Sequence, residues 1–205
     1  MSKILALDPG KERSGWVELE DEKPIAWGWD ANEDVRTRIS HSGTWPWDAV
    51  AVEYMQPRGM PTSQDEMDTM FELGRMTAMV DGIQLAKVSR KDVKMFLLGR
   101  ATGTDANIRQ ALIDLFGGDR HAIGAIKCKT CKGKGWNGAG RPMCEDCHHS
   151  QERNVAGVDM RPEYGCGYEV EPGVLHGLTG HSWSALGVGV TYIAAANSGV
   201  SEVAM

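Results

Sequence analysis

ILALDPGKERSGWV, residues 4–17, begins with the apolar run Ile4-Leu5-Ala6-Leu7 and breaks at Pro9-Gly10. A short apolar run bounded by a Pro-Gly break favours a buried strand. The run ends at Asp8, a carboxylate whose burial is unfavourable unless a positive charge, usually a divalent cation, compensates it. We therefore interpret Asp8 as a candidate metal ligand. The alternative is that Asp8 only opens the turn by bonding to its own backbone.

The composition of the 205-residue chain is that of a soluble globular protein with one sizeable core. Hydrophobic residues make up 41% and charged residues 24% of the chain, which is ordinary for such proteins. No apolar run reaches membrane-spanning length, and the N-terminal run is too short for a signal-peptide core. We expect a cytoplasmic protein with no membrane partner, or one in the host cytoplasm if its source is viral.

Basic residues are concentrated in the middle of an acidic chain. Residues 85–134 contain 11 Lys and Arg against 4 Asp and Glu, although the whole chain carries a net charge of −6. Such a segment can face phosphates and make binding salt-dependent, although a run of charges is usually a solvated helix face. The candidate phosphate contacts before the cysteine-rich segment are Arg75, Lys87, Arg90, Lys91, Lys94, Arg100 and Arg109.

The periodicity of the apolar residues predicts an α/β domain. Strands are expected at 4–7, 14–20, 24–29, 49–52 and 82–88. Helices are expected within 30–40 and at 63–80, 89–98, 105–116 and 179–196. Antiparallel strands followed by βαβ units predict one mixed five-stranded sheet, three strands antiparallel and then parallel, with helices on its faces.

Two of the predicted strands end in acids, Asp8 and Glu53. The final helix carries His181 and Ser184, which are three residues apart and therefore share one face. If this helix crosses the sheet, that face can reach the strand ends and assemble two carboxylates, an imidazole and a hydroxyl. The alternative for His181 is a helix-start histidine that is hydrogen-bonded to the backbone.

Five segments taken in order carry a resemblance to a known family: residues 5–10 with Gly15-Trp16, and residues 50–53, 71–75, 89–99 and 181–187. Together they resemble the RuvC-type Holliday junction resolvases of the RNase H-like superfamily, over roughly three quarters of the chain. The resemblance implies an RNase H-like nuclease domain formed by residues 1–121 and 174–205. It leaves out residues 122–173, which we interpret as an insertion of a viral, phage-like variant.

The resemblance implies a homodimeric endonuclease that uses Mg²⁺ or Mn²⁺ to cut branched DNA such as a four-way junction, leaving 5′-phosphate ends. Asp8 would bridge two metal ions, and Glu53 would bind one of them. His181 would occupy the first of two helix positions at which members carry Asp or His. In this mechanism one ion generates hydroxide from water and the other stabilises the leaving oxygen.

Ser184 departs from the family pattern, because the second helix position is usually Asp. A hydroxyl neutralises less metal charge than a carboxylate does. Three explanations stay open: the enzyme tolerates the change, another acid replaces the Asp, or the protein binds branched DNA with weak or no cleavage. The candidate replacements, each otherwise a solvated helix-face charge, are Asp65, Glu66, Asp68 and Glu72.

The opening Asp-Pro-Gly segment also fits a different class, the phosphate-binding hairpins of sugar kinases and actin-like ATPases. Those proteins need two such lobes, and a chain of 205 residues is too short to supply both.

Four cysteines form two CxxC pairs separated by twelve residues, Cys128 with Cys131 and Cys144 with Cys147. Four thiolates at this spacing fit one tetrahedral structural Zn²⁺ ion. Two disulfides or a redox dithiol are the alternatives, and His148 or His149 could replace a cysteine ligand. Cys166 is then a small buried side chain.

Lysines surround the first CxxC pair, and Lys129, Lys132 and Lys134 are candidate DNA contacts. A zinc-stapled lobe that carries these lysines could bind the phosphates of a DNA arm. The alternatives are that the lobe only stabilises the fold or contacts the dimer partner.

Overall fold

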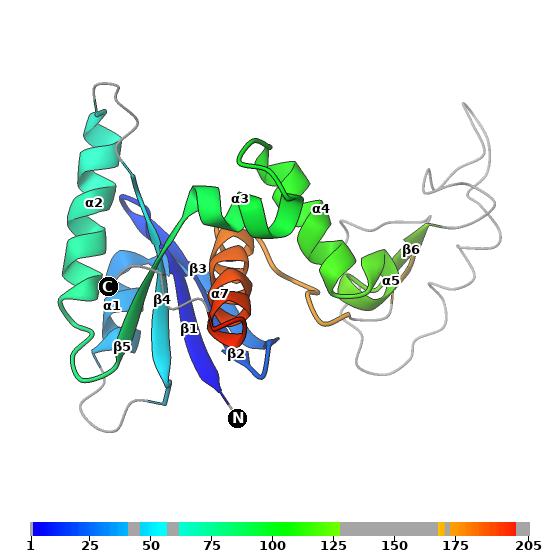
Figure 1. The fold of residues 1–205 in the computed structure, drawn as a ribbon, viewed down its shortest axis with the longest axis horizontal. Helices are drawn as coiled ribbons and strands as arrows, with labels where there is room; N and C mark the ends of the chain where they lie inside the picture. The colour runs from blue at the N-terminus through cyan, green and yellow to red at the C-terminus, as the bar shows by residue number, and fades with distance from the viewer. Residues whose placement is uncertain (1, 41–45, 57–61, 128–167, 171–172, 200–205) are drawn as a thin grey trace. The chain divides into compact units, whose positions relative to one another are not determined.

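The computed structural model describes residues 2–40, 46–56, 62–127, 168–170 and 173–199 (Figure 1). The chain divides into two compact units. One unit is formed by Met1–Leu112 and Leu178–Met205, and the other by Ile113–Gly177. Within the described residues of the second unit lie helix α5 (Gly118–Ala122) and the antiparallel strands β6 (Ala125–Lys127) and β7 (Tyr168–Val170). The sequence analysis did not predict these three elements.

The first unit is built on one mixed five-stranded sheet. Its strands are β1 (Lys3–Asp8), β2 (Arg13–Glu20), β3 (Lys23–Ala31), β4 (Ala49–Tyr54) and β5 (Gln84–Ser89). The spatial order is β3-β2-β1-β4-β5. β1, β2 and β3 pair antiparallel, whereas β4 pairs parallel with both β1 and β5. The mixed sheet predicted from the sequence is therefore confirmed.

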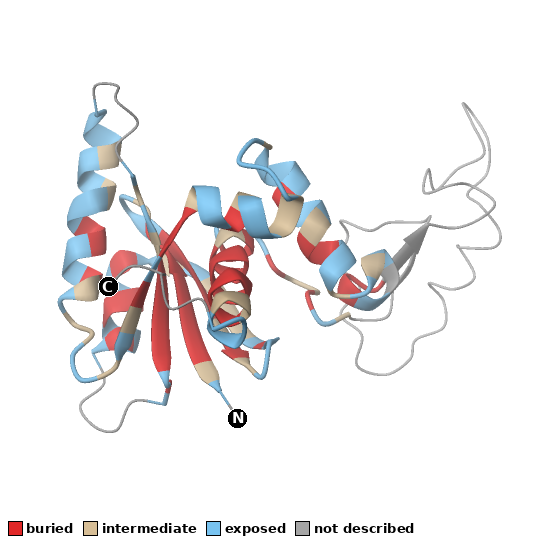
Figure 2. Cartoon of the chain, in the orientation of Figure 1, coloured by how far each residue is buried: buried red, intermediate tan, exposed pale blue. Residues whose placement is uncertain are grey.

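Side-chain alternation divides β1 between the two faces of the sheet. Leu5 and Leu7 belong to a buried cluster that also contains residues of α1 (Asn32–Ile39) and α2 (Gln64–Thr77). Ile4, Ala6 and Asp8 therefore point to the opposite face. Figure 2 shows the central strands β1 and β4 largely buried, which explains why β1 is a continuous apolar run in the sequence.

Helix α7 (Ser182–Asn197) crosses that opposite face and packs against β1 and β2. Most of its residues are buried, so its sequence is apolar around the whole circumference. Gly189 allows the close crossing, because a Cβ there would lie 2.3 Å from Leu19 and 3.0 Å from Ala6. Helix α3 (Arg90–Leu98) packs on α7, and α4 (Asp105–Leu115) follows it in the chain.

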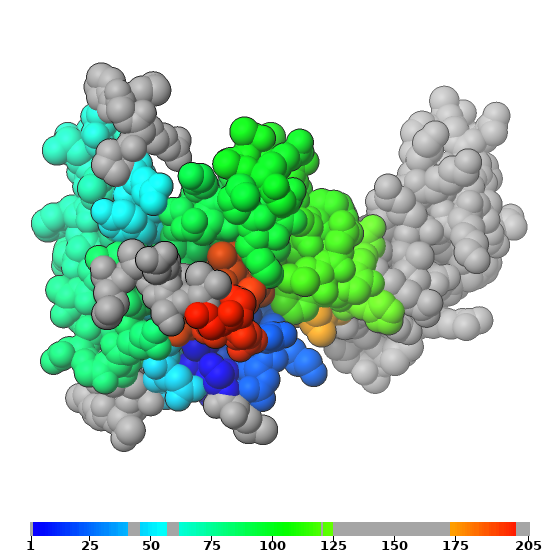
Figure 3. Space-filling view, in the orientation of Figure 1, coloured from blue at the N-terminus to red at the C-terminus, as the bar shows by residue number. Residues whose placement is uncertain are grey.

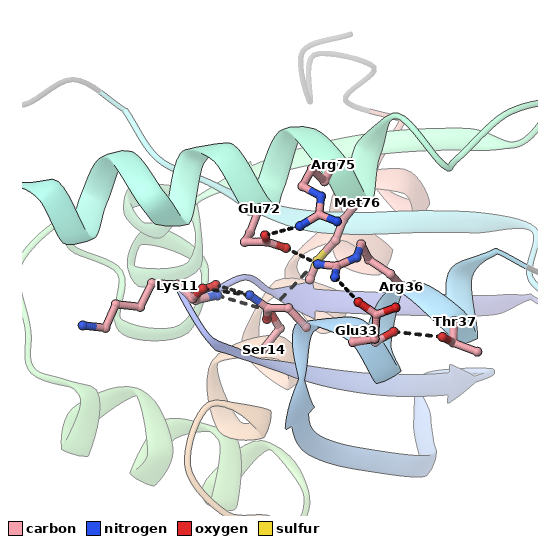
Figure 4. Close-up of polar contacts among 10 residues, drawn as sticks. Lys11, Ser14, Glu33, Arg36, Thr37, Glu72, Arg75 and Met76 are labelled. Atoms are coloured by element: carbon pink, nitrogen blue, oxygen red, sulfur yellow. Dashed lines mark hydrogen bonds and ion pairs between the residues drawn. The ribbon is translucent and has the colours of Figure 1, made fainter.

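A buried ionic network joins α1 to α2 (Figure 4). Arg36 on α1 pairs with Glu72 on α2, and both residues are buried. Glu33 lies 2.6 Å from Arg36, and Arg75 lies 2.8 Å from Glu72. Glu72 was expected to be a solvated charge, and this expectation is wrong because its carboxylate is buried and shared between the guanidinium groups of Arg36 and Arg75.

Capping residues set the helix starts that the sequence predicted. Ser63 caps α2 in a reciprocal capping box with Glu66, and Ser89 caps α3 in the same way with Asp92. Gly99, in the left-handed conformation, ends α3. Among the described residues, no helix is both long and apolar enough to span a bilayer.

Candidate active site

Asp8 and Glu53 lie at the carboxyl ends of neighbouring parallel strands. The register of β1 and β4 pairs Ala6 with Ala51 and Leu7 with Val52, so the next position on each strand carries an acid. Both acids point to the face covered by α7. Asp8 is 8% exposed, and the side chain of Glu53 is 15% exposed. Two largely buried carboxylates are thus held side by side at one edge of the sheet.

His181 meets Asp8 from the start of α7. Its Nδ1 lies 2.7 Å from Oδ2 of Asp8, and this hydrogen bond raises the pKa of His181 above its ordinary value. A neutral ring that donates through Nδ1 presents Nε2 as a lone-pair acceptor, which is the form that ligates metals. The ring is half exposed and also packs against Trp29, with centroids 5.8 Å apart.

Gly15 makes the approach of His181 possible. Gly15 is the β2 partner of Asp8 in the sheet register. A Cβ at Gly15 would lie 2.3 Å from the backbone of His181, a separation that atoms do not tolerate. Only glycine lets the start of α7 descend onto β2 far enough for the imidazole to reach the acid.

The turn after Asp8 is fixed by hydrogen bonds to Asn32, the first residue of α1. The Asn32 amide donates to the carbonyl oxygens of Gly10, at 2.9 Å, and Lys11, at 3.1 Å. Ser14 Oγ donates to Asn32 Oδ1 at 2.7 Å and accepts from the Gly10 amide at 3.2 Å. Asp8 therefore leads into an ordered turn, which supports the position of its carboxylate.

Glu53 is held by Arg90, the first residue of α3. Arg90 Nη1 donates to Glu53 Oε2 at 3.2 Å, and its Nη2 pairs with Asp105 on α4. Burial raises the pKa of Glu53 to about 7, with a further contribution from the charge of Asp8 and an opposing one from Arg90. Burial thus penalises the charged form of Glu53 by more than Arg90 offsets, and a bound cation would compensate this penalty.

Ser184 is the third residue of α7 and is half-buried. Asp8, Glu53 and His181 supply the oxygen and nitrogen donors that suit a hard divalent ion. Nevertheless, within the described part of the chain, no three His, Cys, Asp or Glu side chains form a group that could hold a metal ion as they stand. One oxygen of Asp8 is bonded to His181, and one oxygen of Glu53 is bonded to Arg90.

A cavity of about 800 Å³ opens beside the two acids. Its wall includes Asp8 and Glu53 from the strand ends, Glu66 from α2, and Arg90, Lys91 and Lys94 from α3. In the space-filling view the end of β4 (cyan) lies between α2 and α3 (Figure 3). The cavity therefore combines acids at its base with cations on one side, an arrangement that can receive a phosphate.

The other basic candidates are not among the residues that line this cavity. Arg75 pairs with Glu72, and Arg100 is exposed just after α3. Lys87 lies over the ring of Tyr54, with its Nζ 5.7 Å from the centroid, and Arg109 lies 4.7 Å over the ring of Trp183. Of the basic residues predicted before residue 122, the structure brings three to the acids, namely Arg90, Lys91 and Lys94.

Of the four acids considered as replacements for the missing Asp, only Glu66 lines the cavity. Its carboxylate already accepts the Ser63 amide at 2.9 Å in the capping box. Asp65 pairs with Lys11 at 3.1 Å, and Asp68 accepts from Gln64 at 2.7 Å. Glu72 is committed to the buried network of α1 and α2.

Sequence reasoning missed the roles of Gly15, Asn32 and Asp105. Gly15 is part of the N-terminal segment that carries the family resemblance, but its contact with His181 depends on where α7 crosses the sheet. Asn32 and Asp105 each stand at a helix start, which in the sequence signals only capping. The predicted zinc ligands Cys128, Cys131, Cys144 and Cys147 lie outside the described residues, as do Lys129, Lys132 and Lys134.

Comparisons with known proteins give matches among solved structures. No protein-family profile matches the chain, and no curated protein matches it. The structure of Thermus thermophilus RuvC superimposes with a TM-score of 0.57 at 12% identity, covering 96% of this chain and 96% of RuvC. T. thermophilus RuvC in complex with a Holliday junction substrate matches with a TM-score of 0.56 at 13% identity, covering 97% of each chain. The chain therefore shares the fold of RuvC.

Proposed function

We propose that this protein is a structure-selective endonuclease that cuts branched DNA, with the four-way junction as its substrate. The observation that carries the proposal is the pair of acids, Asp8 and Glu53, at adjacent parallel strand ends, with His181 hydrogen-bonded to Asp8. The fold of T. thermophilus RuvC, one structure of which contains a Holliday junction substrate, supports this choice of DNA.

Asp8, Glu53 and His181 are the residues that we propose hold two Mg²⁺ or Mn²⁺ ions. When bound, such ions would supply a hydroxide nucleophile and neutralise charge on the leaving oxygen, giving 5′-phosphate products. Asp8 also orients the His181 ring through the Nδ1 hydrogen bond. Lys91 and Lys94, on the cavity wall, would bind the phosphate that enters beside the acids.

We further propose a homodimer, because resolving a four-way junction requires two cuts related by approximate two-fold symmetry. Residues 1–121 and 174–205 would form the nuclease domain, and residues 122–173 a zinc-binding insertion held by Cys128, Cys131, Cys144 and Cys147. The remaining DNA contacts that we propose are Arg75, Arg90, Arg100, Lys129, Lys132 and Lys134.

A second candidate is a branched-DNA-binding protein with weak or no cleavage. Two observations favour it. Ser184 stands where the family pattern has a carboxylate, and one oxygen of each acid is already engaged, by His181 or by Arg90. A protein of this kind would keep the junction-binding surface and lose turnover.

The two candidates differ in their action on a synthetic four-way junction with end-labelled strands. A nuclease cuts the junction in Mg²⁺ or Mn²⁺ while leaving a linear duplex of the same sequence intact, and its nicked products can be religated because they carry 5′-phosphate and 3′-hydroxyl ends. Junction binding with no cleavage in either metal would favour the binding protein. Equal cleavage of junction and duplex would contradict the proposed structure selectivity.

A further inference from the structure

Arg90 lies between two carboxylates, at a position in its helix where a positive charge is unfavourable. It is the first residue of α3, where the helix dipole is positive and stabilises anions rather than cations. Its side chain is 21% exposed. Glu53 Oε2 at 3.2 Å and Asp105 Oδ1 are the partners that hold it there. Asp105 is 85% exposed, so water and salt screen its attraction for Arg90. The buried Glu53 therefore attracts Arg90 more strongly than Asp105 does.

Arg90 is bonded to Oε2 of Glu53, so a metal ion bound to this carboxylate would lie close to the guanidinium. A guanidinium and a divalent cation repel each other strongly at contact distance in a half-buried site. Arg90 and a metal ion therefore compete for Glu53, and each weakens the binding of the other. Asp8 does not face this competition from an arginine, because its Oδ2 is bonded to His181.

We propose that Arg90 is a built-in counter-cation that blocks Glu53 until a divalent metal ion displaces it, and that the released guanidinium then binds a phosphate of the DNA. This inference rests on the proposed function of the same site. Arg90 also lines the cavity with Lys91 and Lys94, so the phosphate that those lysines bind lies within the same cavity. Guanidinium groups bind phosphate through two parallel hydrogen bonds, as they bind carboxylates. A phosphate can therefore replace the Glu53 carboxylate as the partner of Arg90.

The exchange links metal binding to DNA binding. Metal ions and phosphates both favour the state in which Arg90 has left Glu53, so each ligand tightens the binding of the other. The metal site is thereby kept weak while no DNA is present. Asp8 and Glu53 therefore bind the metal ion most tightly when a phosphate is there to receive Arg90.

The test is Mn²⁺ binding to the full-length protein, measured by isothermal titration calorimetry without DNA. Arg90→Gln removes the competing charge, so we expect it to bind Mn²⁺ at least tenfold more tightly than the wild type. Lys91→Gln is the matched control, since it removes the same charge from the next residue and from the same cavity wall, and we expect a change below threefold. Arg90→Met is a second variant, which should show the same gain if Arg90→Gln folds poorly.

The link to DNA is tested by the affinity for a fluorescently labelled four-way junction, with and without Ca²⁺ as a metal that does not support turnover. The wild type should bind the junction several-fold more tightly in Ca²⁺, and Arg90→Gln should lose this gain. Wild-type Mn²⁺ affinity in Arg90→Gln and Arg90→Met, or an equal gain in Lys91→Gln, would overturn the inference. Both measurements are made without turnover, so an absence of junction cleavage would count against the proposed function and not against this inference.

Discussion

His181 Nδ1 lies 2.7 Å from Asp8 Oδ2, a contact between residues 173 positions apart in the chain. The contact joins the end of β1 to the start of α7, the first and last elements of the sheet unit. It exists because Gly15, on the strand beside β1, offers no Cβ to the His181 backbone. The position of the imidazole at the site is therefore set by a glycine on a third element.

Substituting Gly15 tests this dependence. Gly15→Ala places a Cβ 2.3 Å from the His181 backbone, so the start of α7 must move away from Asp8. We expect a loss of about 1–3 kcal/mol in the free energy of unfolding and a fall in junction cleavage larger than the fall in junction binding. Urea unfolding and a cleavage assay would measure the two effects.

Gly74→Ala is the control for this substitution. Gly74 lies inside α2, and a Cβ there would meet nothing within 4 Å. Alanine should stabilise the helix by up to about 1 kcal/mol. If Gly15→Ala behaved like Gly74→Ala, the close approach of α7 to β2 would not be what positions His181.

The ionisation of Glu53 and His181 should make the metal-free protein less stable as the pH rises. The pKa of Glu53 is raised from 4.5 to about 7 by burial and by Asp8, so the folded state holds a proton that the unfolded state has lost. The free energy of unfolding therefore falls between these two values. The pKa of His181 is raised from 6.5 by its bond to Asp8. Its contribution is complete below pH 6.5 and is lost above that, in the same direction.

Urea unfolding in Mg²⁺-free buffer at pH 5 and pH 8 would measure this effect. We expect the wild type to lose on the order of 1–3 kcal/mol between the two values. Glu53→Gln should lose less, because an amide has no charge to desolvate, and Mg²⁺ at pH 8 should restore part of the loss in the wild type. Stability that stayed level or rose across this range would show that Glu53 is ionised without penalty in the folded protein.

Restoring the acid at Ser184 should strengthen metal binding. Ser184→Asp adds a carboxylate in the first turn of α7, three residues after His181, where the helix dipole also favours a negative charge. We expect Mn²⁺ affinity to rise by about tenfold or more and junction cleavage to accelerate. Ser184→Asn, of the same shape without the charge, should leave Mn²⁺ affinity near the wild-type value. Equal affinities for the Asp and Asn variants would mean that this position does not reach the metal site.

The cysteine pairs predict one zinc ion per chain, measurable by elemental analysis of the purified protein. Replacing Cys128 and Cys131 by Ser removes two thiolates, so we expect the zinc content to fall from one equivalent to nearly none. Cys166→Ser is the matched control and should retain one equivalent. Wild-type protein that contains no zinc after purification in zinc-supplemented medium would rule out the structural zinc site.

The sheet could be predicted from the sequence because its strands are short, apolar and bounded by turn residues. β1 and β4 are buried on both faces, so each reads as an unbroken apolar run that ends in an acid. The capping pair Ser89 and Asp92 was also recognisable, because a capping box depends only on residues three apart. These features depend on residues close together in the chain, so they can be recognised in a single sequence.

The charge partners could not be predicted, because they join elements that only the tertiary fold brings together. Glu72 carries the spacing of an exposed helix position, yet Arg36 meets it from 36 residues away. Arg90 was predicted only as a candidate phosphate contact; the structure places it at the cavity beside the acids, where its partner Glu53 is 37 residues away on a neighbouring strand. Which cation faces which acid depends on strand register and helix position. Neither of these can be predicted from the spacing of charged residues in the sequence.

The most direct measurement is cleavage and binding of a four-way junction by Asp8→Asn beside the wild type. The amide keeps the shape of the side chain and removes the charge that a divalent ion needs. We expect cleavage in Mg²⁺ or Mn²⁺ to fall by at least about 100-fold, with junction affinity in the absence of metal within about threefold of the wild type. Cleavage by Asp8→Asn at the wild-type rate would contradict the assignment of Asp8, and with it the proposed active site.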